Sequence, residues 1–188
     1  MAVLVCLAIG LLGGTYLYYE VNVDLFGIGR PDFNDLHFNS NYTRVQSDNG
    51  TRWVFVYEKT PPSVFSGLVR HVSPIRLGMD PFLTHDILVT TGDFANPEMV
   101  STRVFNHHFS WSTHNKSAPG GTINLIHAVP LNEAIYDQLL QIRNGQQAVF
   151  TGYEILRIDA YQKTGEYIGK WEDSGCNSML VTSVQVQK

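Results

Sequence analysis

The sequence is poor in charged side chains and in cysteine, and it has no excess of basic residues. Charged residues make up 16 % of the 188, whereas soluble domains usually carry about 25 %. The 13 Lys and Arg residues stand against 17 Asp and Glu residues, which gives a net charge of −4. This balance argues against a dedicated DNA or RNA binder, which usually has a basic face. The presence of only 2 cysteines excludes a disulfide-stapled miniprotein.

The short motifs of several common enzyme classes are also missing. The sequence contains no GxGxxG, no Walker loop, no HExxH, no GxSxG and no CxxC. Each of these spacings places specific groups for cofactor, metal or nucleophile chemistry. We therefore expect no cofactor and no catalytic residue.

The N-terminal residues 2–19 form an uncharged, apolar run. As a helix this run would be about 27 Å long, close to the thickness of the hydrocarbon core of a bilayer. Tyr16, Tyr18 and Tyr19 lie at its end, where amphipathic rings favour the headgroup zone. No Lys or Arg precedes it, unlike in a cleaved signal peptide. We predict that residues 1–20 are a retained, single-pass transmembrane helix; a cleaved signal peptide and a buried helix of a soluble core are the alternatives.

Small residues recur at every fourth position of this helix, at Ala2, Cys6, Gly10 and Gly14. They lie on one helix face, and such a face lets another helix backbone come close within lipid. We predict that it packs against other transmembrane subunits, although small residues are also common in membrane helices without such a partner. We place the main domain on the extracytoplasmic side of the membrane.

The rest of the chain divides into a linker and a β-rich domain. Residues 21–50 have no clear hydrophobic period and are predicted to be a linker or a covering loop. Residues 51–188 are predicted to form the β-rich extracytoplasmic domain, with one soluble helix that Asn132 caps and Asn144-Gly145 end. The expected strands, recognised by alternating or continuous apolar residues, are 51–58, 64–77, 86–91, 102–114, 122–128, 147–159 and 179–187.

From residue 86 onward the expected order is three strands, the helix and two more strands. This order resembles that of an OB-fold, a five-stranded Greek-key barrel. Gly152, inside the fourth of these strands, suits the bend that barrel closure needs. We predict a mainly β fold whose core, about 85–188, is an OB-like barrel with extra strands before it. An unrelated small α+β sandwich is the alternative.

The run 102–114 supplies the candidate ligand-binding residues. In a single strand, Phe105, Phe109 and Trp111 share one face and polar residues share the other. OB-folds bind oligosaccharides or oligonucleotides on this part of the barrel, so the run is a candidate surface for a glycan or a peptide; alternatively, its aromatic face fills the core. Nucleic acid is not expected, because the region has too few basic residues for a binding groove. The candidate ligand-binding residues are Asn106, His108, Trp111 and His114.

Several histidines lie close together in the sequence, and imidazole is a common metal ligand. His108 and His114 are nearly 20 Å apart in an extended strand, too far to chelate one ion. His127 could meet one of the other histidines across the barrel, and Asp86, His127 and a serine could converge. Because the spacing specifies neither arrangement, we expect no metal site.

Several short motifs from about residue 65 onward carry a resemblance. They are Asp86 and Gly92 in DILVTTG, the HAVP sequence at 127–130, the run QLLQIRNGQQAVFTGYEI at 138–155, and Asp173-Ser174-Gly175. In these the chain resembles a family of uncharacterised small bacterial proteins that are anchored in a membrane. The resemblance implies one N-terminal transmembrane helix in a bacterial inner membrane and a β-rich domain in the periplasm, and no established reaction. The family usually has Trp-Gly where this chain has Thr91-Gly92, and a basic residue with aromatics where it has His107 and His108.

The leading hypothesis is a non-catalytic accessory or assembly subunit of a larger membrane protein complex. Its partners are the lipid bilayer and other transmembrane subunits. Two alternatives stay open: an extracytoplasmic module that binds glycans or peptides, and an enzyme with a histidine-centred site.

Overall fold

The structure is a computed structural model that describes residues 32–75, 82–114, 116–173, 175 and 177–187. Within these residues the chain is mainly β, with one α-helix and two short 3-10 helices, which confirms the predicted class. The transmembrane helix predicted over residues 1–20, with Ala2, Cys6, Gly10 and Gly14, lies outside the described residues. Among the described helices, none has the length and apolar character needed to cross a bilayer.

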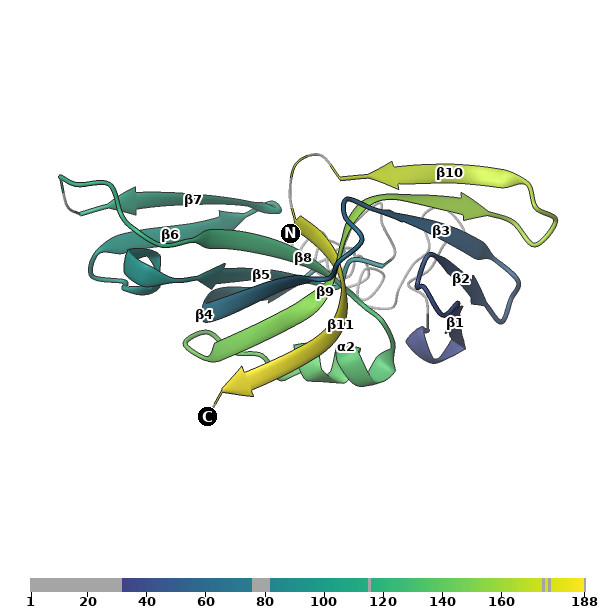
Figure 1. Cartoon of the computed structure of the whole chain (residues 1–188), viewed down its shortest axis with the longest axis horizontal. Helices are drawn as coiled ribbons and strands as arrows, with labels where there is room; N and C mark the ends of the chain where they lie inside the picture. The colour runs from purple at the N-terminus through teal and green to yellow at the C-terminus, as the bar shows by residue number, and fades with distance from the viewer. Residues whose placement is uncertain (1–31, 76–81, 115, 174, 176, 188) are drawn as a thin grey trace, which may run out of the picture.

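Five strands form a closed ring at the centre of the described chain (Figure 1). β4 (Ser63–Pro74) pairs with β5 (His85–Thr90), and β5 pairs with β8 (Ile123–Pro130). β8 pairs with β11 (Asn177–Gln187), β11 pairs with β9 (Gln147–Tyr161), and β9 returns to β4. The β8–β11 pairing is parallel, and the other four are antiparallel. Closure of the ring leaves none of these five strands as a bare edge over its paired residues.

A second, open sheet grows from the C-terminal half of β9. There β9 lies between β3 (Arg52–Tyr57) and β10 (Tyr167–Glu172), and β2 (Arg44–Ser47) and β1 (Leu36–Phe38) continue the sheet beyond β3. The sequence predicts a linker or covering loop over residues 21–50, whereas the described part of that segment contains β1 and β2. These strands are too short to show a hydrophobic period. They are held by tertiary packing of single buried side chains on a core that later segments supply.

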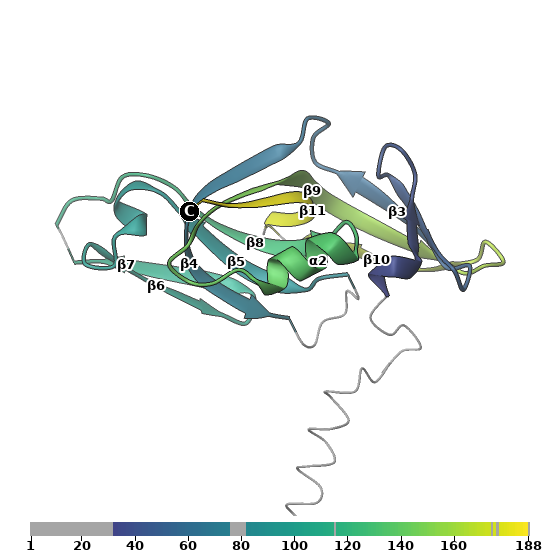
Figure 2. The ribbon, with the colours of Figure 1, turned by 90° about the horizontal axis from the view of Figure 1, so that it is seen from below.

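The two sheets have separate hydrophobic cores. The ring and α2 (Glu133–Leu140) enclose the first core, and the open sheet covers the second. Figure 2 shows α2 lying across the ring, close to β8 and β11. The largest side chains of the first core include Ile87, Ile126, Phe150 and Met179. Those of the second include Trp53, Phe55, Phe82, Ile158 and Leu180.

The helix α2 follows the local sequence signals. Asn132 is its N-cap, and the side-chain oxygen accepts a hydrogen bond from the Ile135 amide at 3.0 Å. Ile135 and Leu139 are buried against the ring. Gly145 has a φ of +88° shortly after the helix ends, a conformation that favours glycine. The predicted helix, with its N-cap, is therefore confirmed.

Gly152 lies where β9 leaves the ring and enters the open sheet. A side chain has no room there, since a Cβ on Gly152 would lie 1.9 Å from the carbonyl oxygen of Leu180. The β9–β11 register shifts between Val181 and Ser183, directly beside the Val181–Gly152 pair. The extra residue of this bulge is Thr182 of β11, so it bends β11 beside Gly152, and the bend predicted at Gly152 of β9 stays a prediction.

The run 102–114, predicted as one strand, is instead a hairpin of two strands. β6 (Val100–Phe105) pairs with β7 (His108–Thr113), and only two residues connect them. Those residues, Asn106 and His107, have φ values of +49° and +62°, as in a type I′ turn. The alternation of side chains along the sequence does not reveal such a reversal, because each of the two strands alternates in the same way as a single long strand.

This hairpin corrects two further expectations. It pairs with no strand of the ring, so the first ring strand is β4, and the five-stranded core begins at Ser63 rather than near residue 85. The aromatic residues of the hairpin are not core residues: Phe105 is 71 % exposed, Trp111 45 % and Phe109 38 %. They stay exposed because the hairpin lies outside the ring, where no other described element covers it fully.

Arg70 of β4 ties the base of the hairpin to the ring. Its guanidinium donates to the carbonyl oxygen of Phe94, in the 3-10 helix η2 (Gly92–Ala95), at 2.8 Å. It also donates to the carbonyl oxygen of Val100, at the start of β6, at 3.0 Å. Hydrogen bonds from the Arg70 side chain therefore hold the hairpin against the ring, although neither β6 nor β7 pairs with a ring strand.

Candidate functional site

Asp86 is a buried carboxylate at the second position of β5. It is paired directly with His127 of β8 in the antiparallel register, so their side chains lie on the same face of the sheet. Asp86 Oδ1 and His127 Nδ1 are 2.6 Å apart. The side chains are only 7 % and 5 % exposed. Such a buried pair needs further partners, because an ionised carboxylate is costly to bury.

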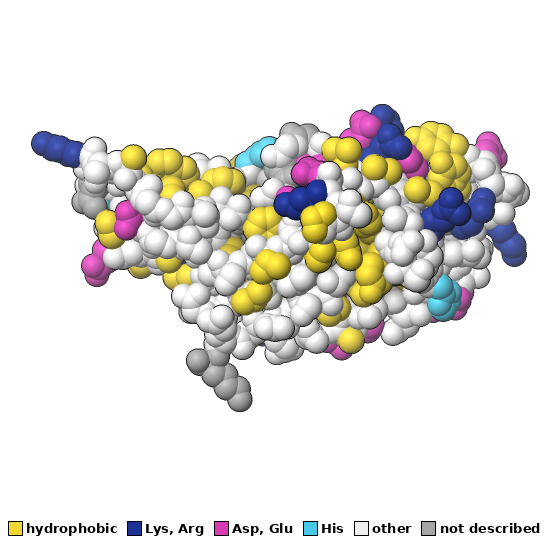
Figure 3. Space-filling view, viewed as in Figure 1, with side chains coloured by type: hydrophobic (Ala, Val, Ile, Leu, Met, Phe, Trp, Pro, Cys, Tyr) yellow, Lys and Arg dark blue, Asp and Glu magenta, His cyan; other side chains and the backbone are white. Residues whose placement is uncertain are grey.

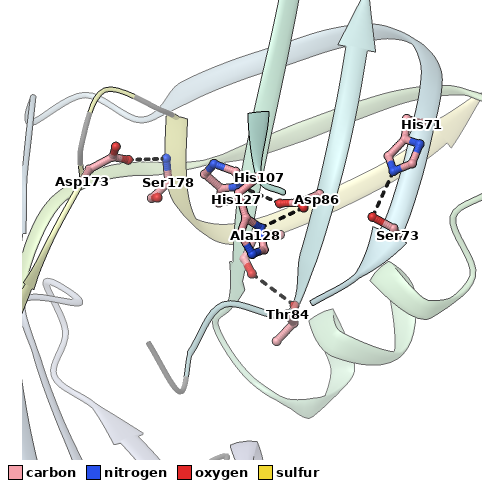
Figure 4. Close-up of polar contacts among 9 residues, drawn as sticks. All are labelled: His71, Ser73, Thr84, Asp86, His107, His127, Ala128, Asp173 and Ser178. Atoms are coloured by element: carbon pink, nitrogen blue, oxygen red, sulfur yellow. Dashed lines mark hydrogen bonds and ion pairs between the residues drawn. The ribbon is translucent and has the colours of Figure 1, made fainter. Parts of the chain in front are cut away.

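His107 comes to this pair from the turn of the hairpin (Figure 4). Its Nδ1 lies 3.0 Å from Asp86 Oδ2, so the two carboxylate oxygens each meet one histidine. The rings of His107 and His127 are 5.8 Å apart and nearly perpendicular, at 80°. The His107 side chain is 42 % exposed, which makes it the side of the cluster that faces solvent. We call Asp86, His107 and His127 the Asp–His–His cluster.

Two serines extend the row of polar residues on this face. Ser73 of β4 pairs with Asp86, and Ser178 of β11 pairs with His127. Ser73 Oγ lies 2.9 Å from Nε2 of His71. The Ser178 residue is 1 % exposed, and its Oγ has no hydrogen-bond partner among the described residues. A buried hydroxyl without a partner is uncommon in folded proteins and calls for an explanation.

Near the cluster, burial favours the neutral form of His71. Burial lowers the pKa of His71, and the negative charge of Asp86 opposes this shift only in part. In the cluster itself, a neutral histidine with its proton on Nδ1 donates to Asp86, whereas one with its proton on Nε2 leaves Nδ1 as an acceptor or a metal ligand. The arrangement can hold a proton between carboxylate and imidazole, or a cation among the three groups.

The four predicted ligand-binding residues all belong to the hairpin region but do not converge. Asn106 lies in the turn and His108 begins β7. Trp111 lies on the opposite face from His108, with its ring packed edge-on at 5.3 Å from Phe94. The Nε2 atom of His114 lies 3.0 Å from Ser101 Oγ, at the far end of β7. In Figure 3, hydrophobic side chains gather over the hairpin at the upper left.

The Asp–His–His cluster is the arrangement that sequence reasoning left unspecified. The expectation that His127 could meet another histidine across the barrel is met by His107, but from a turn outside the ring. His107 and His127 lie 21 and 41 positions from Asp86 in the sequence, and no short motif spans such distances. The available signal was a charged or polar residue inside an apolar strand, as with Asp86 before Ile87 and His127 between Ile126 and Ala128.

A second buried carboxylate, Glu154 of β9, has a structural role. Lys59 Nζ donates to Glu154 Oε1 at 2.8 Å, and the Ser63 hydroxyl donates to the same oxygen. Burial alone would raise the pKa of Glu154, but the hydrogen bonds from Lys59 and Ser63 and the charge of Lys59 hold that pKa below its ordinary value. The contact ties the segment between β3 and β4 to β9.

Comparison with known proteins adds no identification. No protein family, curated protein or solved structure matches the chain. The resemblance to membrane-anchored bacterial proteins therefore stays a prediction.

Proposed function

We propose that the chain is a membrane-anchored, non-catalytic accessory or assembly subunit of a larger membrane protein complex. In this proposal, residues 1–20 span the inner membrane of a bacterium and contact other transmembrane subunits. The β domain is periplasmic, and the β6–β7 hairpin docks on a partner protein. The observation that carries the proposal is the exposure of three aromatic side chains on one hairpin, Phe105, Phe109 and Trp111.

The ring supports an OB-like assignment for the domain. Around the ring the strands follow the order β4, β5, β8, β11, β9 and back to β4. In chain order these are the first, second, third, fifth and fourth strands of the ring. The helix lies between the third and fourth strands, and the third and fifth strands pair in parallel. This arrangement is typical of the five-stranded Greek-key barrel, a fold that binds through its surface and loops and needs no catalytic centre.

The hairpin has the composition of a docking element. Phe105 and Arg103 lie on one face, with the guanidinium 5.6 Å from the ring centroid. Phe109 and Trp111 lie on the other face. Aromatic residues and arginine are enriched among the anchors of protein interfaces. The partner expected from this chemistry is a protein with an apolar groove and an acidic side chain opposite Arg103.

The anchor part of the proposal comes from the sequence alone. Residues 2–19 have the length and apolar composition of a membrane span. The face formed by Ala2, Cys6, Gly10 and Gly14 suits close helix packing in lipid. Two contacts, one in the bilayer and one through the hairpin, would fix the orientation of the domain relative to its partners.

The test is co-purification of the full-length chain from its native membrane in mild detergent, with the partners identified by mass spectrometry. We expect defined partners in stoichiometric amounts. The hairpin variant Phe105→Ser/Trp111→Ser should lose the partner that docks on the domain. The matched control, Tyr167→Ser/Ile168→Ser, changes two residues of β10 that are similarly exposed, at 51 % and 41 %, and should retain it.

A second pair of substitutions tests the anchor. Gly10→Leu/Gly14→Leu keeps the segment apolar but blocks close helix contact, and it should lose the transmembrane partners. A single protein in the wild-type preparation, or equal retention by the hairpin and β10 variants, would contradict the proposal.

A binding module for glycans or peptides is the second candidate. It is favoured by the exposure of Trp111, since an aromatic face suits stacking on a sugar ring, and by the exposure of His108. Titration of the purified chain with cell-wall glycan fragments, followed by Trp fluorescence, distinguishes it from docking. Saturable binding that Trp111→Ala abolishes, without any co-purifying protein, would favour this candidate.

A further inference from the structure

We propose that Asp86, His107 and His127 bind one divalent transition-metal ion of the zinc class. This inference goes beyond the proposed function and does not depend on it. A metal at this position would connect the turn of the hairpin to the two ring strands β5 and β8.

The donor atoms are already close to coordination distance from one another. One ligand atom from each of the three residues lies within 4.8 Å of the others. Neighbouring donor atoms around a zinc ion bound at about 2.1 Å are roughly 3.4 Å apart in a tetrahedral site. The carboxylate oxygens lie 2.6 Å and 3.0 Å from the two Nδ1 atoms. Each of these two separations would change by less than about 1 Å on binding an ion, and the ligand atoms of the two imidazoles lie within 4.8 Å of each other.

The chemistry of the donors selects the class of ion. Two imidazoles and one carboxylate suit zinc and its neighbours in the first transition row, whereas magnesium and calcium prefer oxygen ligands. Three protein ligands leave at least one coordination position for water. The Asp–His–His cluster is therefore expected to discriminate strongly between Zn²⁺ and Mg²⁺.

Burial and charge favour a cation at the same point. The carboxylate of Asp86 is 7 % exposed, and the ion pairs described for it are with His107 and His127, not with lysine or arginine. Since neither imidazole carries a permanent positive charge, the negative charge of Asp86 has no fixed counter-charge in these pairs. A divalent ion compensates that charge and keeps the imidazoles in their neutral, ligating form.

Ser178 is an independent observation that points to a missing ligand. Its Oγ is buried and lacks a hydrogen-bond partner among the described residues. Because Ser178 and His127 are direct partners in the β11–β8 ladder, their side chains lie on the same side of the sheet. Figure 4 draws Ser178 beside the two histidines. A water bound to the metal would give this hydroxyl a hydrogen-bond partner.

The exposed position of His107 provides the route into the site. Asp86 and His127 are buried in the sheet, whereas His107 lies in a two-residue turn and is partly open to solvent. His107 is therefore the donor nearest to solvent, and an ion that enters the site passes its side chain before it meets the two buried donors.

The test uses the full-length chain in mild detergent, purified with a tag that contains no histidine and stripped of metal with a chelator. Calorimetric titration with ZnCl₂ should give one ion per chain, and MgCl₂ should give no binding. His107→Asn, which keeps a residue type that tolerates the left-handed turn, should weaken zinc binding at least tenfold. The matched control His108→Asn changes the adjacent exposed histidine and should leave the affinity within twofold.

Cobalt provides a readout that does not depend on a variant. Co²⁺ bound by the cluster should give the strong visible absorption of a low-coordinate site, and equimolar Zn²⁺ should remove it. The inference fails if wild-type protein binds no zinc, or if the two histidine variants bind it equally. It also fails if bound cobalt has the weak spectrum of the hydrated ion.

Discussion

Replacing Gly152 by alanine is expected to destabilise the chain strongly, because it disturbs the closure of the ring. A Cβ at this position would lie 1.9 Å from the Leu180 carbonyl oxygen, 2.8 Å from the Leu180 carbonyl carbon and 3.0 Å from Met179 Cε. The two backbone contacts cannot be relieved by rotating a side chain. Strands β9 and β11 must therefore separate by about 1 Å or more to restore ordinary contact distances.

The magnitude follows from two contributions. Forcing an extra methyl group into a packed site costs about 1–3 kcal/mol. A separation of that size also stretches the ladder bonds around the Val181–Gly152 pair beyond hydrogen-bonding distance. The loss of two such bonds costs about 0.5–1.5 kcal/mol each. The expected loss in free energy of unfolding is about 2–6 kcal/mol, a large part of the roughly 5–15 kcal/mol of a typical domain.

The assay is urea unfolding of the full-length chain in detergent, followed by Trp fluorescence, with Trp53 in the second core as one of the reporters. The matched control is Gly169→Ala in β10, where an added Cβ would meet no atom within 4 Å. That variant should change the free energy of unfolding by less than about 1 kcal/mol. If Gly152→Ala and Gly169→Ala were equally stable, the ring closure described here would be refuted.

Three further changes test other parts of the structure. Asn132→Ala should cost about 1 kcal/mol in the same urea assay, because α2 loses its N-cap, whereas Asn132→Asp should retain most of the stability. The lowered pKa of Glu154 means that its ionised form contributes stability above the ordinary pKa of 4.5 and that this contribution is lost as the pH falls below that value. Thermal unfolding in a series of acidic buffers should therefore show a steeper loss for the wild type than for Glu154→Gln. Arg70→Met removes the bonds to Phe94 and Val100, so limited proteolysis should cut the β6–β7 hairpin faster while the ring strands stay protected.

Several elements of the fold could be predicted from local sequence. Asn132 marks the start of α2 because a polar residue before an apolar stripe satisfies the first amides of a helix. Gly152 marks the point where β11 comes close to β9, because a glycine inside a strand allows close approach of another backbone. These signals involve neighbours in the sequence and need no knowledge of the partner strands.

Other elements could not be predicted, since they depend on distant partners. The run 102–114 alternates like one long strand, and the reversal at Asn106 and His107 is set by two left-handed backbone conformations. Strands β1 and β2 contain too few residues to show a period and depend on a core that later segments supply. The expected OB-like order therefore assigned one strand wrongly and began the ring one strand too late.

The candidate site shows the same division. The sequence by itself determined the residue types, namely a carboxylate and imidazoles embedded in apolar strands, the helix with its cap, and the apolar N-terminal run. Only the tertiary structure decided that Asp86 pairs with His127 and that a turn outside the ring brings His107 to the same carboxylate. The physical reason is that strand register over tens of residues is fixed by the packing of both faces of the sheet, and no local spacing in the chain encodes it.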